Sequence, residues 1–203
     1  MAEPHDTLDL LDYRRAVSEM YRRVRHGPPG EETWAQWRRA RDDLFASHSQ
    51  TALDPGDLDK FDGLPFFDYD PGWRVEATVE PIPEEELAIG HSDQGFTAFR
   101  RFGQLEFELH GGELALSLYW LDSYGGGVFL PFRDGTSGEE TYGGGRYLLD
   151  TAKGADLGHE GDLIVLDFNY AYHPSCVYSY RWSCPLAPLE NQVDLRITAG
   201  ERL

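Results

Sequence analysis

From residue 73 onwards the apolar residues recur at every second position in short runs, and no helical pattern separates one run from the next. Trp73, Val75, Ala77 and Val79, for example, alternate with charged or polar residues, which is the period of a half-buried strand. Parallel strands need long crossover connections, usually helical, so this pattern predicts an antiparallel sheet. The predicted strands, about eight in all, lie at residues 73–79, 96–102, 105–109, 114–118, 127–132, 145–150, 162–168 and 193–198.

The turns in this region predict how the sheet is shaped. Two consecutive glycines within His110–Glu113 separate two of the strands and predict a tight β-hairpin turn. Antiparallel strands must protect the sheet edges, by closing into a barrel or by stacking as a sandwich. We expect a lipocalin-like antiparallel β-barrel, closed or partly open, with a β-sandwich as the alternative. Glycines at the predicted turns favour the strong curvature of a barrel: Gly103, Gly111, Gly112, Gly125–Gly127 and Gly143–Gly145.

Two helices are predicted ahead of the sheet. Apolar residues recur at spacings of three and four over 8–25, which is typical of an amphipathic helix, and two prolines and two glycines at 27–30 end it. A second helix is expected over 31–47, with two acidic residues in its first turn and with Trp34 and Trp37 in the core. The length of 203 residues suits one compact domain. The expected fold class is α+β, mainly β: a single domain over 1–203, with an N-terminal helical hairpin at 1–50 and the β-barrel body at 60–203.

The charge composition narrows the choice of partners. Acidic residues outnumber basic ones 36 to 18, a net charge of -18, so the surface repels phosphates and nucleic acid is not an expected partner. No apolar run approaches the roughly 20 residues that span a bilayer, and the acidic amino terminus does not resemble a signal peptide. We therefore expect no membrane partner and a cytoplasmic location. Cys176 and Cys184 are expected there as thiols, with a disulfide that closes a short loop as the alternative.

Residues able to bind or react are concentrated in two stretches, of which the first is 122–150. It combines two glycine triplets with Arg133, Asp134 and Arg146. Glycines let the backbone approach a ligand closely, and an arginine in a fixed frame suits a carboxylate or phosphate. Alternatively, the arginines pair with neighbouring aspartates as structural salt bridges. Neither triplet is followed by Gly-Lys-Ser/Thr or begins a predicted helix, which excludes a phosphate-binding loop.

The second stretch follows an apolar strand and contains Asp167, Asn169, His173 and Cys176, with Cys184 further along. A zinc site using His173 and the two cysteines, with or without Asp167, matches no standard zinc spacing, so we expect no metal. A cysteine nucleophile with His173 as base, oriented by Asn169 or Asp167, is a second alternative. Simple packing of the cysteines in apolar space is a third. Four other histidines share no spacing and are expected at the surface: His48, His91, His110 and His159.

Short motifs spread over nearly the whole chain are similar to those of a single family. They are Leu44-Phe45, His48–Gln50, Phe61–Leu64, Tyr69–Pro71, Phe129–Asp134, Glu140–Tyr147, Asp167–Asn169, Ala171-Tyr172, Cys176, Cys184–Leu186 and Glu190-Asn191. On these residues the chain resembles the bacterial and archaeal family named domain of unknown function (DUF) 1684. The resemblance implies amino-terminal helices, a β-rich body and no established activity. Family members more often carry Asn at position 173, which weakens the metal and nucleophile hypotheses that depend on His173.

We expect a small-molecule-binding β-barrel whose arginines hold an anionic metabolite. An acid–base or hydrolytic enzyme using the same pocket is the alternative, with Asp134 or Asp167 as the proton carrier and Arg146 stabilising negative charge. A structural or interaction protein without a ligand is the second alternative. No cofactor is expected. The expected ligand-binding residues are Arg133, Asp134, Thr136, Tyr142, Arg146, Asp167, Asn169 and Tyr172.

Overall fold

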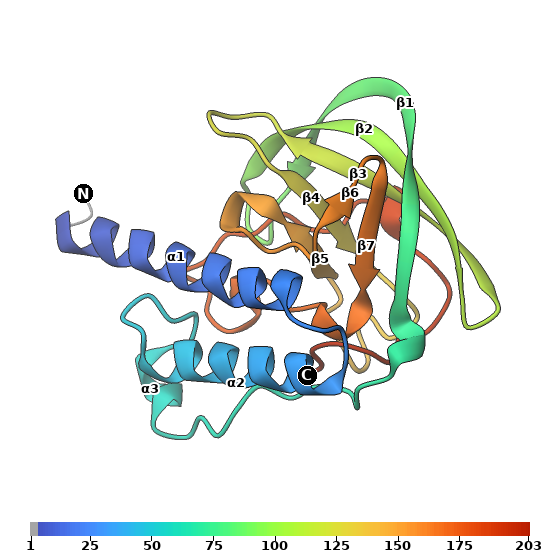
Figure 1. The fold of residues 1–203 in the computed structure, drawn as a ribbon. Coiled ribbons are helices and arrows are strands. Elements are labelled where there is room, and N and C mark those ends of the chain that lie inside the picture. The colour runs from blue at the N-terminus through green and yellow to red at the C-terminus, as the bar shows by residue number, and fades with distance from the viewer. Residues whose placement is uncertain (1–3) are drawn as a thin grey trace.

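The computed structural model describes residues 4–203 and contains the predicted helical hairpin (Figure 1). Helix α1 spans Pro4–His26 and helix α2 spans Glu31–Ser47, and the two lie side by side in opposite directions. Trp34 and Trp37 of α2 are buried, as predicted. A third helix, α3, is a single turn at Pro55–Leu58. Within residues 4–203, no helix combines the length and the apolarity that crossing a membrane requires.

Seven strands of the described residues form one sheet in the order β5-β4-β3-β2-β1-β7-β6. All neighbouring strands are antiparallel, so the predicted α+β, mainly antiparallel architecture is confirmed. The strands are β1 (Arg74–Gly90), β2 (Phe96–Leu109), β3 (Gly112–Leu121), β4 (Val128–Phe132), β5 (Arg146–Asp150), β6 (His159–Glu160) and β7 (Leu163–Asp167).

The hairpin between β2 and β3 forms where the glycine pair predicted it. Leu109 pairs with Gly112 across a two-residue turn, in which His110 has φ 49° and Gly111 has φ 76°. Both central residues of the tightest hairpin turns need positive φ, and glycine adopts it without a Cβ penalty. The turn fixes the register of the two strands.

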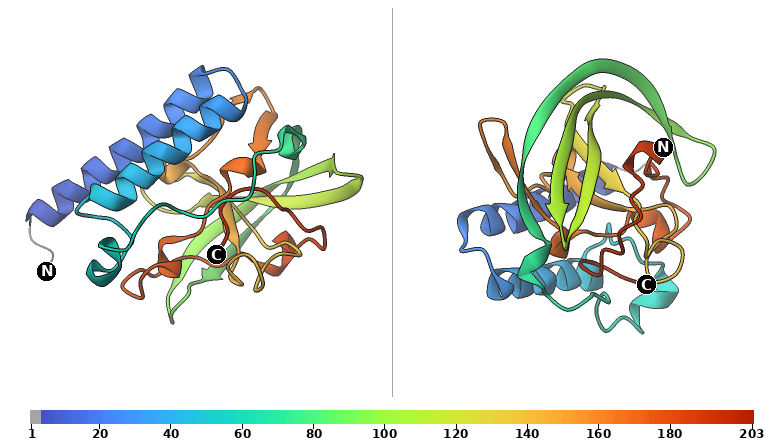
Figure 2. Two further views of the ribbon diagram at one scale, coloured as in Figure 1. Left: turned by 90° about the horizontal axis from the view of Figure 1, so that it is seen from below. Right: turned by 90° about the vertical axis from the view of Figure 1, so that its right-hand side faces the viewer.

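The sheet does not close, so the closed barrel is not confirmed. Its edges are β5 and β6, and its curvature comes from bulges after Pro81 in β1 and after Arg101 in β2. Strand β1 pairs with β7 through Arg74–Thr78 and with β2 through Val79–Gly90, and it bends over the other strands between these two partners (Figure 2). Bulges increase local twist and bend the strand that carries them, which curves the sheet without joining its edges.

Strand β1 runs to Gly90, well beyond the predicted end at residue 79, and three further details of the strand prediction differ from the structure. The runs at 96–102 and 105–109 form one continuous strand, because Gly103 lies at a bulge rather than at a turn. The predicted strand at 193–198 is wrong, because the Ile197 amide and carbonyl bond to buried side chains rather than to a neighbouring strand. The two-residue strand β6 had no alternating pattern that could have predicted it.

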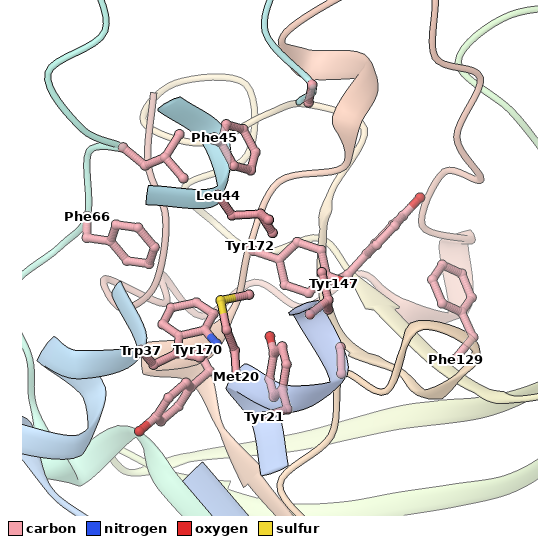
Figure 3. Packing of buried hydrophobic residues seen from close by; sticks show 14 of the residues in the cluster. Met20, Tyr21, Trp37, Leu44, Phe45, Phe66, Phe129, Tyr147, Tyr170 and Tyr172 are labelled. Atoms are coloured by element: carbon pink, nitrogen blue, oxygen red, sulfur yellow. The ribbon is translucent and has the colours of Figure 1, made fainter. Parts of the chain in front are cut away.

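Two apolar clusters hold these elements together. One lies between the helices and the sheet and is rich in aromatic rings, with Tyr21 and Trp37 from the helices packing near Tyr147 and Tyr170 (Figure 3). The ring centroids of Trp37 and Tyr170 are 5.0 Å apart in an edge-to-face arrangement, which aromatic pairs favour. The other cluster lies within the bend of the sheet and includes Leu105, Leu116, Leu118, Leu130, Phe132 and Phe168.

Candidate functional site

The predicted site residues around Arg146 meet in a buried hydrogen-bond network. Arg146, at the start of β5, is 0% exposed. Its guanidinium donates to the carbonyl oxygens of Ile197 (2.9 Å), Ala199 and Glu201 (3.2 Å). It also donates to Asp134 Oδ1 at 3.3 Å. Arg146 thereby joins the edge of the sheet to the C-terminal segment.

Asp134 receives further hydrogen bonds inside the protein. Thr136 Oγ1 lies 3.0 and 2.9 Å from its two carboxylate oxygens, and the Ile197 amide donates to Oδ2 at 2.7 Å. Thr136 Oγ1 also shares a hydrogen bond of 2.9 Å with Thr141 Oγ1. Asp134 is 5% exposed and Thr136 is 0% exposed. The arrangement matches the alternative of a structural salt bridge, because the Asp134 carboxylate is bound by Arg146 and by buried groups of the protein itself.

Asp167 and Asn169 form a separate local structure at the end of β7. Asp167 Oδ1 accepts from the Asn169 amide at 3.0 Å and from Asn169 Nδ2 at 2.7 Å. The Asn169 side chain also makes two hydrogen bonds to the Asp70 backbone. Its Oδ1 accepts from the Asp70 amide at 3.1 Å, and its Nδ2 donates to the Asp70 carbonyl at 2.9 Å. Burial raises the pKa of Asp167, against the lowering effect of its hydrogen bonds from Asn169. These bonds cap a short turn and fix the entry to β1.

A second buried arginine connects the C-terminal segment to helix α2. Arg41 Nη2 lies 2.9 Å from Glu201 Oε2, which also accepts from the His173 amide at 3.0 Å. His173 Nε2 accepts from the Tyr142 amide at 3.2 Å. Burial, together with Arg146 and Arg41, lowers the pKa of His173 to about 3. No sequence motif indicated Arg41 or Glu201 as partners, because they are 160 residues apart.

The residues considered for a zinc site are not arranged as one. His173 Nε2 faces a backbone amide, and Cys176 and Cys184 are free thiols. Among residues 4–203, no group of three His, Cys, Asp or Glu side chains could hold a metal ion. Tyr172 packs under the Arg41 guanidinium, and its hydroxyl lies 3.5 Å from Asp150 Oδ2.

A cavity of about 560 Å³ lies beside the first glycine triplet, and we call it the glycine-loop cavity. All three glycines have positive φ, and a Cβ on Gly127 would come within 2.8 Å of the Ala152 amide nitrogen. A Cβ on Gly126 would overlap the Trp120 ring. The loop therefore needs glycine to reach its place. The cavity is lined by Arg14, His91, Thr97, Phe99, Leu121, Ser123–Phe129, Tyr147, Asp150–Lys153, Ser183 and Pro185.

The glycine-loop cavity is positively charged within an acidic protein. Arg14 and Lys153 contribute two cations to its lining and Asp150 contributes one carboxylate. Lys153 Nζ lies 2.6 Å from Asp150 Oδ2. Burial lowers the pKa of Lys153, but the charge and hydrogen bond of Asp150, with smaller effects of Cys184 and Tyr13, raise it above its ordinary value. The ammonium therefore stays charged at neutral pH while it borders the cavity.

Hydroxyl groups and an imidazole form a chain at the other side of this cavity. His91 Nδ1 lies 2.7 Å from Ser183 Oγ, and His91 Nε2 lies 2.7 Å from Thr97 Oγ1. Ser183 donates its only hydroxyl proton to Asp93 Oδ1 at 2.7 Å. Ser183 must then accept from His91 Nδ1–H, and in the neutral imidazole Nε2 is unprotonated and accepts from the Thr97 hydroxyl. The geometry thus fixes the tautomer of His91 and aims its basic nitrogen at Thr97.

The predicted ligand-binding residues and the observed cavity differ. None of the eight predicted residues lines the glycine-loop cavity. Tyr142 lines a cavity that contains Cys176, and Arg133 lines a third one. The glycine triplet at 125–127 was the one sequence signal that pointed to the observed cavity. His91 had been expected only as a surface residue, because its partners Thr97 and Ser183 come together only in the folded chain.

Comparison with known proteins places this fold in a family. The family model described as "Protein of unknown function (DUF1684)" matches residues 59–202. The chain belongs to the DUF1684 family. A solution NMR structure of an uncharacterised protein from Haloarcula marismortui (gene locus rrnAC0354) shares 41% sequence identity with this DUF1684 protein and has a TM-score of 0.61. The match covers 85% of this chain and 94% of the other one. No curated protein matches the chain.

Replacing Arg146 with Ala should destabilise this DUF1684 protein severely. The change leaves the Asp134 carboxylate buried without its cation and removes the donors to three carbonyl groups. We expect the free energy of unfolding, measured by urea titration, to fall by about 3–5 kcal/mol. Arg196→Ala is the control, because its ion pairs with Glu139 and Glu140 are half exposed and should contribute less than about 1 kcal/mol. Unchanged stability of Arg146→Ala would contradict the structural role.

His173 should make the stability of the DUF1684 protein depend on pH. Its pKa is about 3 in the folded state, against 6.5 ordinarily. Above pH 6.5 the imidazole is neutral in both states and contributes nothing. As the pH falls below 6.5, the unfolded chain takes up a proton that the folded chain rejects, so stability falls by about 1.4 kcal/mol per pH unit.

The variant His173→Gln isolates this effect. Its Oε1 has the same reach as His173 Nε2 and can accept from the Tyr142 amide, but the amide side chain does not titrate. Unfolding curves at pH 7, 6, 5 and 4 should show the wild type losing stability relative to the variant as the pH falls. Parallel pH dependence of the two proteins would show that His173 titrates normally in the fold.

Proposed function

We propose that this protein binds an anionic small molecule with an apolar or aromatic part, and that the ligand occupies the glycine-loop cavity. The observation that carries the proposal is the combination, in one cavity of about 560 Å³, of a charged lysine with an aromatic wall. Cavities of roughly 300–1,000 Å³ that pair apolar walls with a few polar groups are the usual form of small-molecule sites.

The aromatic wall suits a planar or aliphatic group. The rings of Phe99 and Phe129 are stacked with centroids 5.1 Å apart, and Tyr147 meets Phe129 edge-on at 4.7 Å. Tyr147 is held in place by a hydrogen bond from its hydroxyl to the Pro185 carbonyl at 2.5 Å. A wall fixed in this way loses little conformational freedom when a ligand packs against it.

Charge favours an anion over a cation. The lining carries two cations and one carboxylate, whereas the whole chain has a net charge of -18. An anionic group can take a hydrogen bond from Lys153 without displacing Asp150, because an ammonium has three donors. This keeps the anionic metabolite expected from the sequence but moves its site from Arg146, which is buried, to Lys153.

The fluorescent anion 8-anilinonaphthalene-1-sulfonate tests this proposal, since it combines an aromatic body with one negative charge. We expect saturable binding to the folded wild type and an affinity reduced roughly tenfold, about 1.4 kcal/mol, in Lys153→Gln. The loss of the ammonium removes an attraction and leaves Asp150 to repel the sulfonate. Fluorescence titration measures both constants, and circular dichroism confirms that each variant is folded.

The second lysine of the chain provides the matched control. Lys60 is exposed in the loop after α3 and lines none of the cavities described above, so Lys60→Gln should leave the affinity unchanged. The uncharged analogue N-phenyl-1-naphthylamine should bind wild type and Lys153→Gln equally, because it lacks the sulfonate. Equal loss of the anionic dye in both lysine variants, or no binding by the wild type, would refute the proposal.

A second candidate function is ester hydrolysis in the same cavity. The hydrogen bonds that join Ser183, His91 and Thr97 favour it. Thr97 Oγ1 would attack an ester carbonyl while His91 Nε2 takes up its proton and then passes it to the leaving alcohol. Water would release the acyl group from Thr97 and restore the hydroxyl. Asp134 and Asp167, the acids weighed from the sequence, are buried in other networks.

Hydrolysis of p-nitrophenyl acetate tests this second candidate. If the chain of hydrogen bonds is catalytic, Thr97→Val and His91→Asn should each lower the rate by roughly a hundredfold or more. Thr97→Ser should keep activity because it retains the hydroxyl, and Thr78→Val, an exposed threonine on β1, should not change it. A wild type no faster than these Thr97 and His91 variants would leave ligand binding as the function.

A further inference from the structure

Outside the glycine-loop cavity, the two cysteines of the chain are free thiols, both partly exposed, and near enough for each to shift the pKa of the other. Cys176 belongs to the short helical turn Ser175–Val177, and Cys184 lies in the segment that pairs with the loop after β1. The Ser92 amide donates to the Cys184 carbonyl at 2.9 Å, and the Cys184 amide lies 3.3 Å from Ser92 Oγ. Backbone contacts with Ser92 therefore hold Cys184 beside Cys176.

Three donors converge on Cys176. Ser92 and Tyr142 line the same cavity as Cys176. Their side chains and the Cys184 thiol are placed to act as donors to the Cys176 thiol and so to lower its pKa. Tyr142 is itself positioned by its amide, which donates to His173 Nε2. These donors, of which Cys184 has the largest effect, lower the pKa of Cys176 to about 6, although burial acts to raise it. Hydrogen bonding to Cys176 and burial raise the pKa of Cys184. The pair thus consists of one thiolate and one thiol at neutral pH.

Cys176 opens onto a cavity of about 530 Å³ that differs in charge from the glycine-loop cavity. Asp54, Asp57 and Asp93 line it together with Tyr178 and Trp182. Three carboxylates repel anionic oxidants such as glutathione disulfide, which carries a net negative charge. A neutral oxidant of small size, such as a hydroperoxide, meets no such repulsion.

We propose that Cys176 and Cys184 form a redox-active thiol pair that reduces hydroperoxides. The Cys176 thiolate attacks the terminal peroxide oxygen, the O–O bond breaks, and the departing alkoxide takes a proton to leave as an alcohol, or as water from hydrogen peroxide. Cys176 becomes a sulfenic acid. Cys184 then attacks the Cys176 sulfur, which forms the disulfide and releases water. The two thiols supply both electrons, and an external dithiol returns the pair to the reduced state.

The two single-thiol variants separate the roles of the cysteines. Iodoacetamide alkylation of Cys184→Ser, in which Cys176 is the one remaining thiol, should reach half its maximal rate below pH 7, because the serine hydroxyl replaces the Cys184 thiol as a donor to Cys176. Cys176→Ser, which leaves Cys184, should do so above pH 9, because burial continues to raise the pKa of that thiol. Similar midpoints near pH 8.5 in both variants would overturn the proposal.

Peroxide treatment of the folded full-length chain tests the reaction itself. With one equivalent of hydrogen peroxide, the wild type should lose two hydrogen atoms by intact mass spectrometry and recover them with dithiothreitol. Cys184→Ser should gain one oxygen atom that dimedone traps, and Cys176→Ser should stay unchanged at the same peroxide concentration. A wild type that stays reduced, or a Cys176→Ser variant that oxidises as fast as Cys184→Ser, would overturn the proposal.

Removing the hydroxyl donors distinguishes a tuned thiolate from two cysteines that happen to be close. Ser92→Ala and Tyr142→Phe should each raise the alkylation midpoint in the Cys184→Ser background and slow sulfenic acid formation at pH 6. Ser49→Ala, which removes an exposed hydroxyl bonded to Asp9, is the matched control. Midpoints that stay the same in all three variants would show that the hydroxyls do not stabilise the thiolate, and would count against the proposed pair.

Discussion

The buried Arg146 guanidinium is the constraint on which the arrangement of this molecule depends. A cation that is 0% exposed must have acceptors, and three of its four are carbonyl groups of the C-terminal segment. Those carbonyls belong to Ile197, Ala199 and Glu201. At these carbonyls the Arg146 side chain takes the place that the amides of a neighbouring strand would have, and the segment is not a strand. The same segment then presents the Glu201 carboxylate to Arg41, so two arginines connect the sheet, the C-terminal segment and the helical hairpin.

This framework separates the polar groups that hold the fold from those that face the cavities. Asp134 and Arg146 bond to each other and to the backbone around them. The residues around the glycine-loop cavity have the opposite character: they come from loops and strand ends, and their side chains border open space. Binding groups commonly sit on loops that a rigid scaffold positions. Here the scaffold includes a buried ion pair, so substitutions in it should act through stability rather than through direct contact with a ligand.

The sequence predicted the elements whose signals are local. Periodicity specified the two helices, the glycine pair after His110 specified a hairpin, and the lack of crossovers specified antiparallel strands. Whether the sheet closes was not predictable, because its curvature depends on bulges such as the one after Pro81. The residues on each side of a bulge still alternate as in a regular strand, so the sequence does not reveal it. The site was missed for a related reason. Arg146 and Asp134 looked like ligand groups because arginine and aspartate serve both roles, and only burial distinguishes them. His91 and Ser183 lie 92 residues apart, and no spacing rule brings them together.

The two proposed sites share one wall. The loop after β1 pairs with the segment around Cys184: His91 bridges to Pro185, and Ser92 bonds to Cys184 in both directions. His91 and Pro185 line the glycine-loop cavity, whereas Ser92 lines the cavity beside Cys176. Successive residues of a β-like pair point to opposite faces, so this short pairing gives each cavity its own set of side chains from the same backbone. The sites can therefore differ in charge, one bordered by Lys153 and Arg14 and the other by aspartates, although they are neighbours. Because they share this backbone, a covalent bond formed at Cys184 acts on a segment that also lines the glycine-loop cavity.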